Sequence, residues 1–353
     1  MKHFIQLLSL MMVTMMVGCS NDDSTPTSAY TDAESFFTEL DYQGTVIIKK
    51  GDTEILSRGF GLANQTTGES NGLNTKFRLA SVSKTLTAMA VVQLKRDGLI
   101  DNFDQTISEF DDDFPNGDQI TLKQLLMHQS GLPDYVGAIE PLAKSGTSIT
   151  SEDIYEVIQE EVAENGLLFS PGTSVAYSNS NFLITALLIE ALSEQSYTDY
   201  VMEKILSPLG MDATEPGQPA IDGQGYARGY QGTEDVSSYP IHIALGAGNW
   251  TSTATDMLLW CEAIMGDWLT SEEKAFVFPG DVPLESTLLG MGWFKSNIGG
   301  TLYYWHGGDI DGFSTMIGFI PEQQGIIITL SNQEDPTGMQ REQIIETLLR
   351  KEF

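Results

Sequence analysis

The chain has 353 residues, and 41% of them are hydrophobic, which is enough for a sizeable folded core. It carries 18 Lys and Arg residues against 49 Asp and Glu residues, a formal net charge of −31. Nucleic acids and anionic membrane surfaces attract positive charge, so this balance argues against nucleic acid as a partner and against a polybasic membrane contact. We interpret the acidic excess as a solvated surface, and the length as two domains or one large composite domain.

The N-terminus has the pattern of an export signal. Lys2 precedes an apolar run over residues 4–18, shorter than the roughly 20 residues of a membrane-spanning helix. The run ends at Gly18-Cys19, which resembles the lipobox of bacterial lipoproteins. We predict a signal peptide over residues 1–18, lipidation of Cys19 and a polar tether over residues 19–30. The protein would then be anchored to a lipid bilayer of the bacterial cell envelope; an ordinary signal peptide with a coincidental cysteine is the alternative.

A helix and a strand pair follow the tether in the predicted order of elements. Apolar residues recur on one helical face over residues 33–40. Residues 44–50 and 53–61 predict two strands of a hairpin, joined at Gly51-Asp52. A further helix is expected to begin at Ser81 and to end at Gly98.

The middle and the C-terminal parts of the chain differ in pattern. Residues 101–244 predict mostly helical pieces, including residues 181–192 and 197–206, and loops. The C-terminal part alternates as a sheet does and closes with a helix, giving strands over 291–294, 302–305, 314–320 and 325–330 and a helix over 340–349. Strands at both ends predict an α+β fold, in which residues 31–100 and 245–353 form an α/β domain and residues 101–244 a helical insertion.

Ser81 and Lys84 are candidates for nucleophilic chemistry. Residues three apart lie on the same face of a helix, so the hydroxyl and the amine can meet. A lysine can remove the proton of a serine if burial lowers the pKa of its amine. Ser271 and Lys274 repeat the spacing, but Glu272 and the residue after it make that segment look like an ordinary helix start. Spacing alone therefore does not decide between the two segments.

Tyr177 and Asn179 lie two residues apart in a stretch expected to be non-helical, so both side chains can point the same way. A phenol can relay a proton, and an amide can hold a substrate carbonyl. The alternatives are a half-buried core tyrosine and an asparagine that caps the next helix.

His306, Gly307 and Gly308 are expected at the end of a strand. Two glycines there allow a substrate backbone to approach closely, and the N–H of Asp309 could help to hold an oxyanion. His306 could instead be a structural histidine.

These motifs together resemble the serine β-lactamase and penicillin-binding-protein superfamily, in particular its class C-like branch. Residues 120–135 (ITLKQLLMHQSGLPDY), 169–179 (FSPGTSVAYSN) and 246–256 (GAGNWTSTATD) are also typical of it. The resemblance implies an antiparallel sheet flanked by helices, with a helical domain inserted. It further implies particular roles for site residues: Ser81 as the acyl-forming nucleophile, Lys84 as its proton partner, Tyr177 as a proton shuttle, Asn179 as a holder of the acyl side chain, and the N–H groups of Ser81 and Asp309 as the oxyanion hole.

One motif departs from the family pattern. The third motif is usually Lys-Thr-Gly, and here it is His306-Gly307-Gly308. Histidine is only partly charged near neutral pH, and Asp309 and Asp311 are expected to repel anions. We therefore favour a serine hydrolase of an ester or an amide or peptide, such as a D-amino-acid derivative. The alternatives are a true β-lactamase or D-Ala-D-Ala carboxypeptidase and a non-catalytic binding protein of the envelope.

Two further classes of enzyme receive little support from the sequence. Gly68-Glu69-Ser70-Asn71-Gly72 has the letters of an α/β-hydrolase nucleophile elbow, but it lies in the expected loop 64–74 with no strand before it and no helix after it. The four histidines are scattered, and no metal-binding or nucleotide-binding motif is present in the sequence. We expect no metal and no cofactor.

Overall fold

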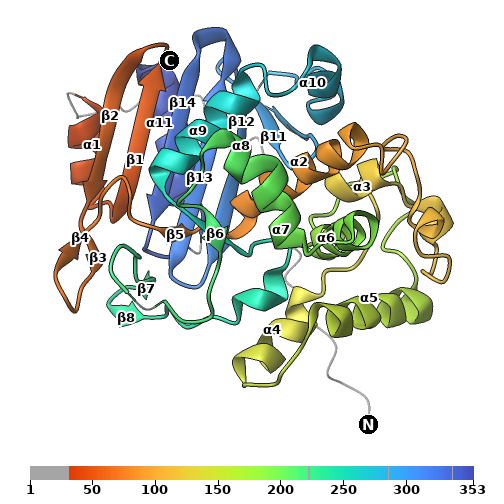
Figure 1. Ribbon diagram of the computed structural model, residues 1–353. Coiled ribbons are helices and arrows are strands. Elements are labelled where there is room, and N and C mark those ends of the chain that lie inside the picture. Colours follow the sequence, from red (N-terminus) through yellow and green to blue (C-terminus); the bar gives the residue numbers. More distant parts are fainter. Residues whose placement is uncertain (1–31, 222, 285, 336) are drawn as a thin grey trace, which may run out of the picture.

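The computed structural model describes residues 32–221, 223–284, 286–335 and 337–353 (Figure 1). The predicted signal peptide, Cys19 and the tether lie outside these residues. Within the described ranges, no helix combines the length and the apolar character that crossing a membrane requires.

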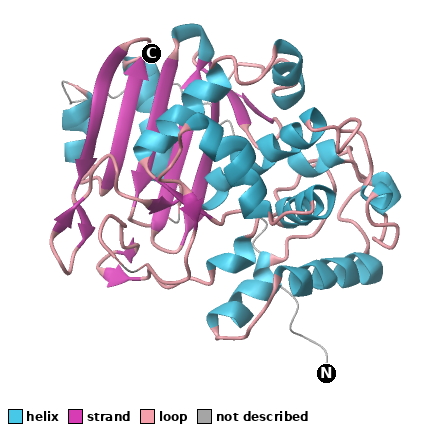
Figure 2. Ribbon diagram, in the orientation of Figure 1, coloured by secondary structure: helices cyan, strands magenta, loops and turns pink. Residues whose placement is uncertain are grey.

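A seven-stranded antiparallel sheet is built from both ends of the chain (Figure 2). Its strand order is β10-β11-β12-β13-β14-β1-β2. β1 pairs with β14 along its full length, from Gly44 opposite Ser331 to Lys50 opposite Gly325, which joins the N-terminal hairpin to the C-terminal strands. The strands are β1 (Gly44–Lys50), β2 (Thr53–Phe60), β10 (Ser286–Leu289), β11 (Phe294–Ile298), β12 (Thr301–Ile310), β13 (Phe313–Ile320) and β14 (Gly325–Ser331). The predicted antiparallel α+β fold is confirmed.

Helices cover both faces of this sheet because the strands alternate their apolar side chains (Figure 1). On β1, Val46 and Ile48 join one buried cluster, together with residues of α1 (Ala33–Glu39) and α11 (Met339–Lys351). Ile47 faces the other way and joins the larger cluster, to which α9 (Ala254–Met265) contributes. The sheet is thus the middle of three layers, and the apolar side chains on both of its faces pack against helices.

Residues 101–244 contribute most of the helices beside the sheet (Figure 1). They comprise α3 (Leu122–Leu126), α4 (Val136–Lys144), α5 (Ser151–Asn165), α6 (Ser180–Ser193), α7 (Tyr197–Val201), a π-helical turn (Met202–Leu206) and α8 (Ser207–Leu209). Short strands elsewhere are β3 (Leu62–Asn64), β4 (Glu69–Ser70), β5 (Phe77–Arg78), β6 (Glu215–Pro216), β7 (Tyr230–Gln231), β8 (Glu234–Asp235) and β9 (Trp250–Ser252). The helices predicted around residues 181–192 and 197–206 are present.

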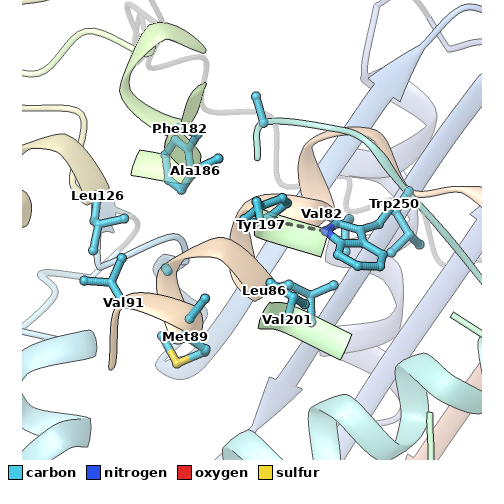
Figure 3. Packing of buried hydrophobic residues seen from close by; sticks show 14 of the residues in the cluster. Val82, Leu86, Met89, Val91, Leu126, Phe182, Ala186, Tyr197, Val201 and Trp250 are labelled. Carbon is cyan, nitrogen blue, oxygen red and sulfur yellow. Dashed lines mark hydrogen bonds between the residues drawn. The ribbon is translucent and has the colours of Figure 1, made fainter. Parts of the chain in front are cut away.

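Helix α2 (Ser83–Arg96) is the central helix and is buried on almost all sides. Its side chains pack against α6 and α7 and against the segment that carries Trp250 (Figure 3). The Trp250 Nε1–H donates a hydrogen bond of 2.9 Å to the Tyr197 hydroxyl, which also lies 2.6 Å from the Thr87 hydroxyl. This packing fixes the N-terminal end of α2, where the candidate nucleophile lies.

Three predicted boundaries are wrong at the level of single elements. The helix expected to begin at Ser81 begins at Ser83, after a 3₁₀ turn over Ala80–Val82. The strand expected over residues 291–294 begins only at Phe294. The expected loop 64–74 contains β4, which pairs with β3 directly before the loop, and both strands are too short to leave an alternating pattern.

The position of His306-Gly307-Gly308 also differs from the prediction. These residues lie inside β12 rather than at its end, since Gly307 pairs with Met316 and Gly308 with Thr315 of β13. Main-chain pairing needs no side chain, so glycines can continue a strand where another chain segment must come close.

Candidate active site

The 3₁₀ turn before α2 carries the candidate nucleophile. Ala80, directly before Ser81, has a φ of +47°, a backbone conformation that residues other than glycine rarely adopt. Such strain is often found at functional sites, where the surrounding packing maintains it. Ser81 lies in this turn and Lys84 in the first turn of α2, three residues apart on one helical face, and the Lys84 Nζ lies 3.0 Å from the Ser81 Oγ. The pairing predicted from the spacing is therefore present.

Lys84 is completely buried, and its amine has three oxygen neighbours. They are the Ser81 hydroxyl, the Asn179 Oδ1 at 2.8 Å and the Ala247 carbonyl oxygen at 2.6 Å. Burial lowers the pKa of Lys84 to about 7, against the opposing influence of the Asp134 charge. Near neutral pH the amine is therefore present partly as the free base.

The Ala247 carbonyl reaches Lys84 because its loop packs tightly against α6. Gly246 has a φ of +69°, and a Cβ at this position would lie 2.4 Å from the Phe182 carbonyl oxygen and 2.7 Å from the Ala186 Cβ. Only glycine fits such a conformation at such a distance. Sequence reasoning missed this oxygen because any residue type supplies a backbone carbonyl.

Tyr177 and Asn179 both face Lys84, as their spacing predicts. The Lys84 Nζ lies 5.0 Å from the centre of the Tyr177 ring. Tyr177 is 42% exposed, so it is not a half-buried core residue. Asn179 precedes α6, but its side chain makes no capping hydrogen bond, so the capping alternative is also wrong. Its Oδ1 accepts from Lys84, and its Nδ2 donates to the Asp134 carboxylate at 2.9 Å.

The Tyr177 phenol is a poor acid in this environment. Although the Tyr177 side chain is partly exposed, desolvation of its phenol group raises the pKa of Tyr177 above the ordinary value, and the neighbouring Ser81 hydroxyl opposes this. The phenol thus keeps its proton near neutral pH and can give it to a stronger base.

The His128 ring stacks against the Tyr177 ring, a role that the sequence analysis did not assign to it. The two rings stack with their centres 4.3 Å apart. The His128 Nδ1 accepts a hydrogen bond of 3.1 Å from the Ser178 N–H, and the Asn181 Nδ2 lies 3.2 Å from the same nitrogen. Burial holds the pKa of His128 well below its ordinary value, so the ring is neutral. These contacts hold the segment that carries Tyr177 in place.

The third motif contributes backbone rather than charge. A Cβ on Gly308 would lie 2.9 Å from the Ser81 nitrogen and 2.2 Å from the Leu79 carbonyl oxygen, so β12 passes directly beside the nucleophile. His306 is 3% exposed, and its Nδ1 lies 2.6 Å from the Gly307 carbonyl oxygen. Burial lowers the pKa of His306 to about 3, so the prediction that this residue is partly charged near neutral pH is wrong.

A cavity of about 280 Å³ opens in front of Ser81. Ser81, Asn179 and Asp309 line it, whereas His306, Gly307 and Gly308 are not among its lining residues. Tyr135 and Val136 at the start of α4 form part of the opposite wall. Several lining side chains are carboxylates, namely Glu140, Asp309, Asp311, Glu334 and Asp335.

Cations next to the cavity are already paired with carboxylates. The Arg341 Nη2 lies 2.6 Å from Asp309 Oδ2. The Lys144 Nζ lies 2.7 Å from Glu140 Oε1 and 2.6 Å from Asp311 Oδ2. The repulsion of anions expected from Asp309 and Asp311 is therefore reduced by their partners, but neither partner is left to attract an anion.

The competing serines lie in other surroundings. Ser271 is exposed at the start of α10 (Ser271–Val277), where Thr270 and Glu273 form a capping box. Ser70 is exposed on the two-residue strand β4, and no helix follows it. The nucleophile-elbow interpretation of Ser70 is therefore wrong, and the capping interpretation of the Ser271 segment is confirmed.

The chain has an antiparallel sheet built from both of its ends. Beside this sheet lies a central helix whose start carries a serine next to a buried lysine. Together these features define a β-lactamase/transpeptidase-like fold. The sequence model of the Beta-lactamase family matches residues 37–350. The chain belongs to this Beta-lactamase family.

Relatives and solved structures agree with this membership. A penicillin-binding protein of Bacillus subtilis (strain 168) is 27% identical over 318 residues, covering 84% of this chain and 69% of the relative. A solved penicillin-binding protein from Bacillus halodurans has a TM-score of 0.74 and 25% identity, covering 91% of this chain and 98% of that one. The D-amino acid amidase of Ochrobactrum anthropi SV3, solved with L-phenylalanine amide, has a TM-score of 0.75 and 23% identity over 87% and 92% of the two chains, a likeness of fold alone.

Proposed function

We propose that this protein is a serine hydrolase that works through an acyl-enzyme on Ser81. The observation that carries the proposal is the set of neighbours around Lys84. Asn179 Oδ1 and the Ala247 carbonyl can only accept hydrogen bonds, whereas the Ser81 hydroxyl can donate or accept. A neutral amine has two hydrogens and one lone pair, so the lone pair is left for the Ser81 hydroxyl hydrogen.

Acylation begins when Lys84 takes the proton of Ser81. Its pKa of about 7 keeps enough free base at neutral pH for this transfer. The Ser81 Oγ then forms a bond to the substrate carbonyl carbon, and the carbonyl oxygen becomes an oxyanion. The N–H groups of Ser81 and Asp309 are proposed to hold that oxyanion, and the Asn179 amide to hold the acyl side chain.

Collapse of the tetrahedral intermediate requires a proton for the leaving group. Tyr177 is suited to give it, because its raised pKa keeps the phenol protonated until a stronger base appears. The Lys84 ammonium then returns a proton to the tyrosinate. In deacylation, water gives a proton to this same base system and its oxygen bonds to the acyl carbon. The bond from that carbon to the Ser81 Oγ then breaks, and the base returns the proton to the Oγ as the acid product leaves.

The charges at the cavity favour a substrate without a carboxylate beside the scissile bond. His306 is neutral where the family pattern has a lysine, and Arg341 and Lys144 are already paired. Glu334 lies at the same cavity, and burial and the neighbouring Asp311 raise its pKa. We therefore propose an ester or an amide or peptide as the substrate, such as a D-amino-acid amide with its free amino group, rather than a penicillin or a peptide carboxylate.

Covalent labelling tests the proposal. The full chain, solubilised in mild detergent, is treated with a fluorophosphonate and separately with a fluorescent penicillin, and the adduct is located by peptide mass spectrometry. We expect a fluorophosphonate adduct on Ser81 and little penicillin adduct. Equal labelling by both probes would favour the penicillin-recognising alternative. Folded protein that takes neither label would favour the non-catalytic binding protein.

We also propose that the protein is a lipid-anchored component of the bacterial cell envelope. The support is the sequence around Gly18-Cys19 alone. Metabolic labelling with a palmitate analogue should mark the wild-type protein and not the Cys19→Ala variant. Labelling that persists in Cys19→Ala would contradict the proposed lipidation site.

A further inference from the structure

Asp134 lies beside the candidate site with both carboxylate oxygens engaged. It belongs to the segment that joins α3 to α4, within the family-typical stretch 120–135, but no role was assigned to it from the sequence. Its Oδ1 accepts a hydrogen bond of 3.0 Å from the Val136 N–H at the start of α4. Its Oδ2 accepts the hydrogen bond of 2.9 Å from the Asn179 Nδ2. The carboxylate is therefore held by the backbone on one side and holds the amide on the other.

This contact determines which way the Asn179 amide points. A carboxylate can only accept hydrogen bonds, so the amide must turn its NH₂ group toward Asp134. Its oxygen then faces the Lys84 amine, as observed. The opposite orientation would place NH₂ against the amine and the amide oxygen against the carboxylate, two repulsive contacts. One Nδ2 hydrogen serves Asp134, and the other can serve a substrate carbonyl.

Asp134 also supplies charge near Lys84. The titratable groups that influence or face the amine are His128, His306, Tyr177 and Asp134. Burial keeps both histidines neutral, and Tyr177 keeps its proton, while Arg341 acts on His306 and Tyr177. The Asp134 charge is the influence that opposes the lowering of the Lys84 pKa by burial.

We infer that Asp134 is a positioning residue of this site, which orients the Asn179 amide toward Lys84 and balances the charge of the buried amine. The inference rests on the proposed function, because it assigns Asp134 an effect on the activation of Ser81. It predicts two separable consequences: loss of the charge changes the pH at which Lys84 becomes a base, and loss of the acceptor releases Asn179.

Two substitutions separate these consequences. Asp134→Asn removes the charge and keeps one acceptor for Asn179, while Asp134→Ala removes both. The readout is the rate of fluorophosphonate labelling at Ser81 of the full chain between pH 5 and pH 9. Because a negative charge stabilises the protonated amine, the midpoint should move to lower pH by roughly half a unit in both variants. The plateau rate should fall about 10-fold in Asp134→Ala and less in Asp134→Asn.

A double-mutant cycle and a matched control sharpen the test. Asn179→Ala should lower the plateau, and adding Asp134→Ala should lower it little further, because the two residues act through one contact. Asp52→Asn, an exposed position in the turn between β1 and β2, removes one charge far from this contact and should keep the wild-type profile. Thermal unfolding of each variant verifies that the labelled protein is folded.

The outcomes distinguish this inference from the proposed function. If wild-type protein is not labelled at Ser81, the proposed function fails and the inference with it. If wild-type protein is labelled and both Asp134 variants keep its midpoint and its plateau, the inference fails and the proposed function stands. Additive losses in the Asp134 and Asn179 double variant would also contradict the positioning role.

Discussion

Two segments of the chain share the spacing Ser-x-x-Lys and differ in everything else that matters for reactivity. Lys84 is completely buried, and one of the three oxygens around its amine is the Ser81 hydroxyl. Lys274 is only partly buried, and its amine donates to the Met265 and Gly266 carbonyls at 3.0 and 2.6 Å. Ser271 has no part in those bonds.

The second segment is an ordinary helix start whose lysine stabilises a neighbouring helix. Met265 is the last residue of α9, and a cation at the C-terminal end of a helix interacts favourably with its dipole. The comparison teaches that spacing brings a serine and a lysine to one face, whereas burial and the remaining acceptors decide whether the lysine can act as a base.

The largest expected difference between the segments is the effect of removing the serine. Ser81→Ala should abolish fluorophosphonate labelling and lower any turnover by at least about 10⁴-fold, because no other hydroxyl lies against Lys84 among the residues the structure describes. The Ser271→Ala variant should be labelled at Ser81 at the wild-type rate. Loss of labelling in Ser271→Ala with retention in Ser81→Ala would reverse the assignment.

The next difference concerns the lysines. Lys84→Met keeps the approximate length of the side chain without its amine, and labelling should slow by about 10²–10⁴-fold because general-base catalysis is lost. Lys274→Met should label normally and lower the free energy of unfolding by about 1 kcal/mol, since two carbonyls lose a donor. Labelling rates and denaturant unfolding of the two variants give both quantities. An active Lys84→Met protein would remove Lys84 from the mechanism.

A smaller effect is expected from the stack of His128 on Tyr177, the ring that faces Lys84. His128 has a φ of +54°, which asparagine tolerates, and an asparagine side chain at this position can still accept from the Ser178 N–H. His128→Asn therefore removes the ring stack on Tyr177, whereas His128→Phe keeps an aromatic ring and leaves that N–H unpaired. We expect His128→Asn to slow labelling by up to about 10-fold, and His128→Phe chiefly to destabilise the fold by about 1–3 kcal/mol. Unchanged labelling in His128→Asn would show that the stack does not position Tyr177.

The smallest expected effect belongs to the cap of the second segment. The Thr270 hydroxyl accepts from the Glu273 N–H at 3.2 Å, and Thr270→Ala should lower the free energy of unfolding by about 1 kcal/mol without affecting labelling. Thr270→Ser should restore the stability. A change in the rate of labelling at Ser81 would mean that α10 affects the nucleophile, and would contradict the independence of the two segments.

Much of the fold could be predicted because its elements carry strong local signals. The run of β-branched residues over 45–48 and the long apolar run of α6 each indicate one type of element. β10 and the β3–β4 pair were missed, because strands of two to four residues are too short to show a period. The two glycines inside β12 have low strand propensity, so the predicted strand ended too early.

The candidate site could be predicted where a side chain belongs to a spaced motif, as do Ser81, Lys84, Tyr177 and Asn179. Asp134 lies in the family-typical stretch 120–135, but its contact with Asn179 could not be predicted, since it is one of 49 acidic residues and its partner lies 45 positions along the chain. His128 acts by stacking, which leaves no pattern. The neutral state of His306 depends on burial, a property of the folded chain that its residue type does not reveal.

The central claim is that a buried, readily deprotonated Lys84 activates Ser81. It is tested most directly by the rate of fluorophosphonate labelling at Ser81 of the wild-type full chain as a function of pH. The reactive form is the free amine, so the rate should rise with pH through a midpoint near the Lys84 pKa of about 7 and then level off. A rate that keeps rising toward pH 10, as an ordinary exposed lysine would give, or one that does not depend on pH, would contradict the account.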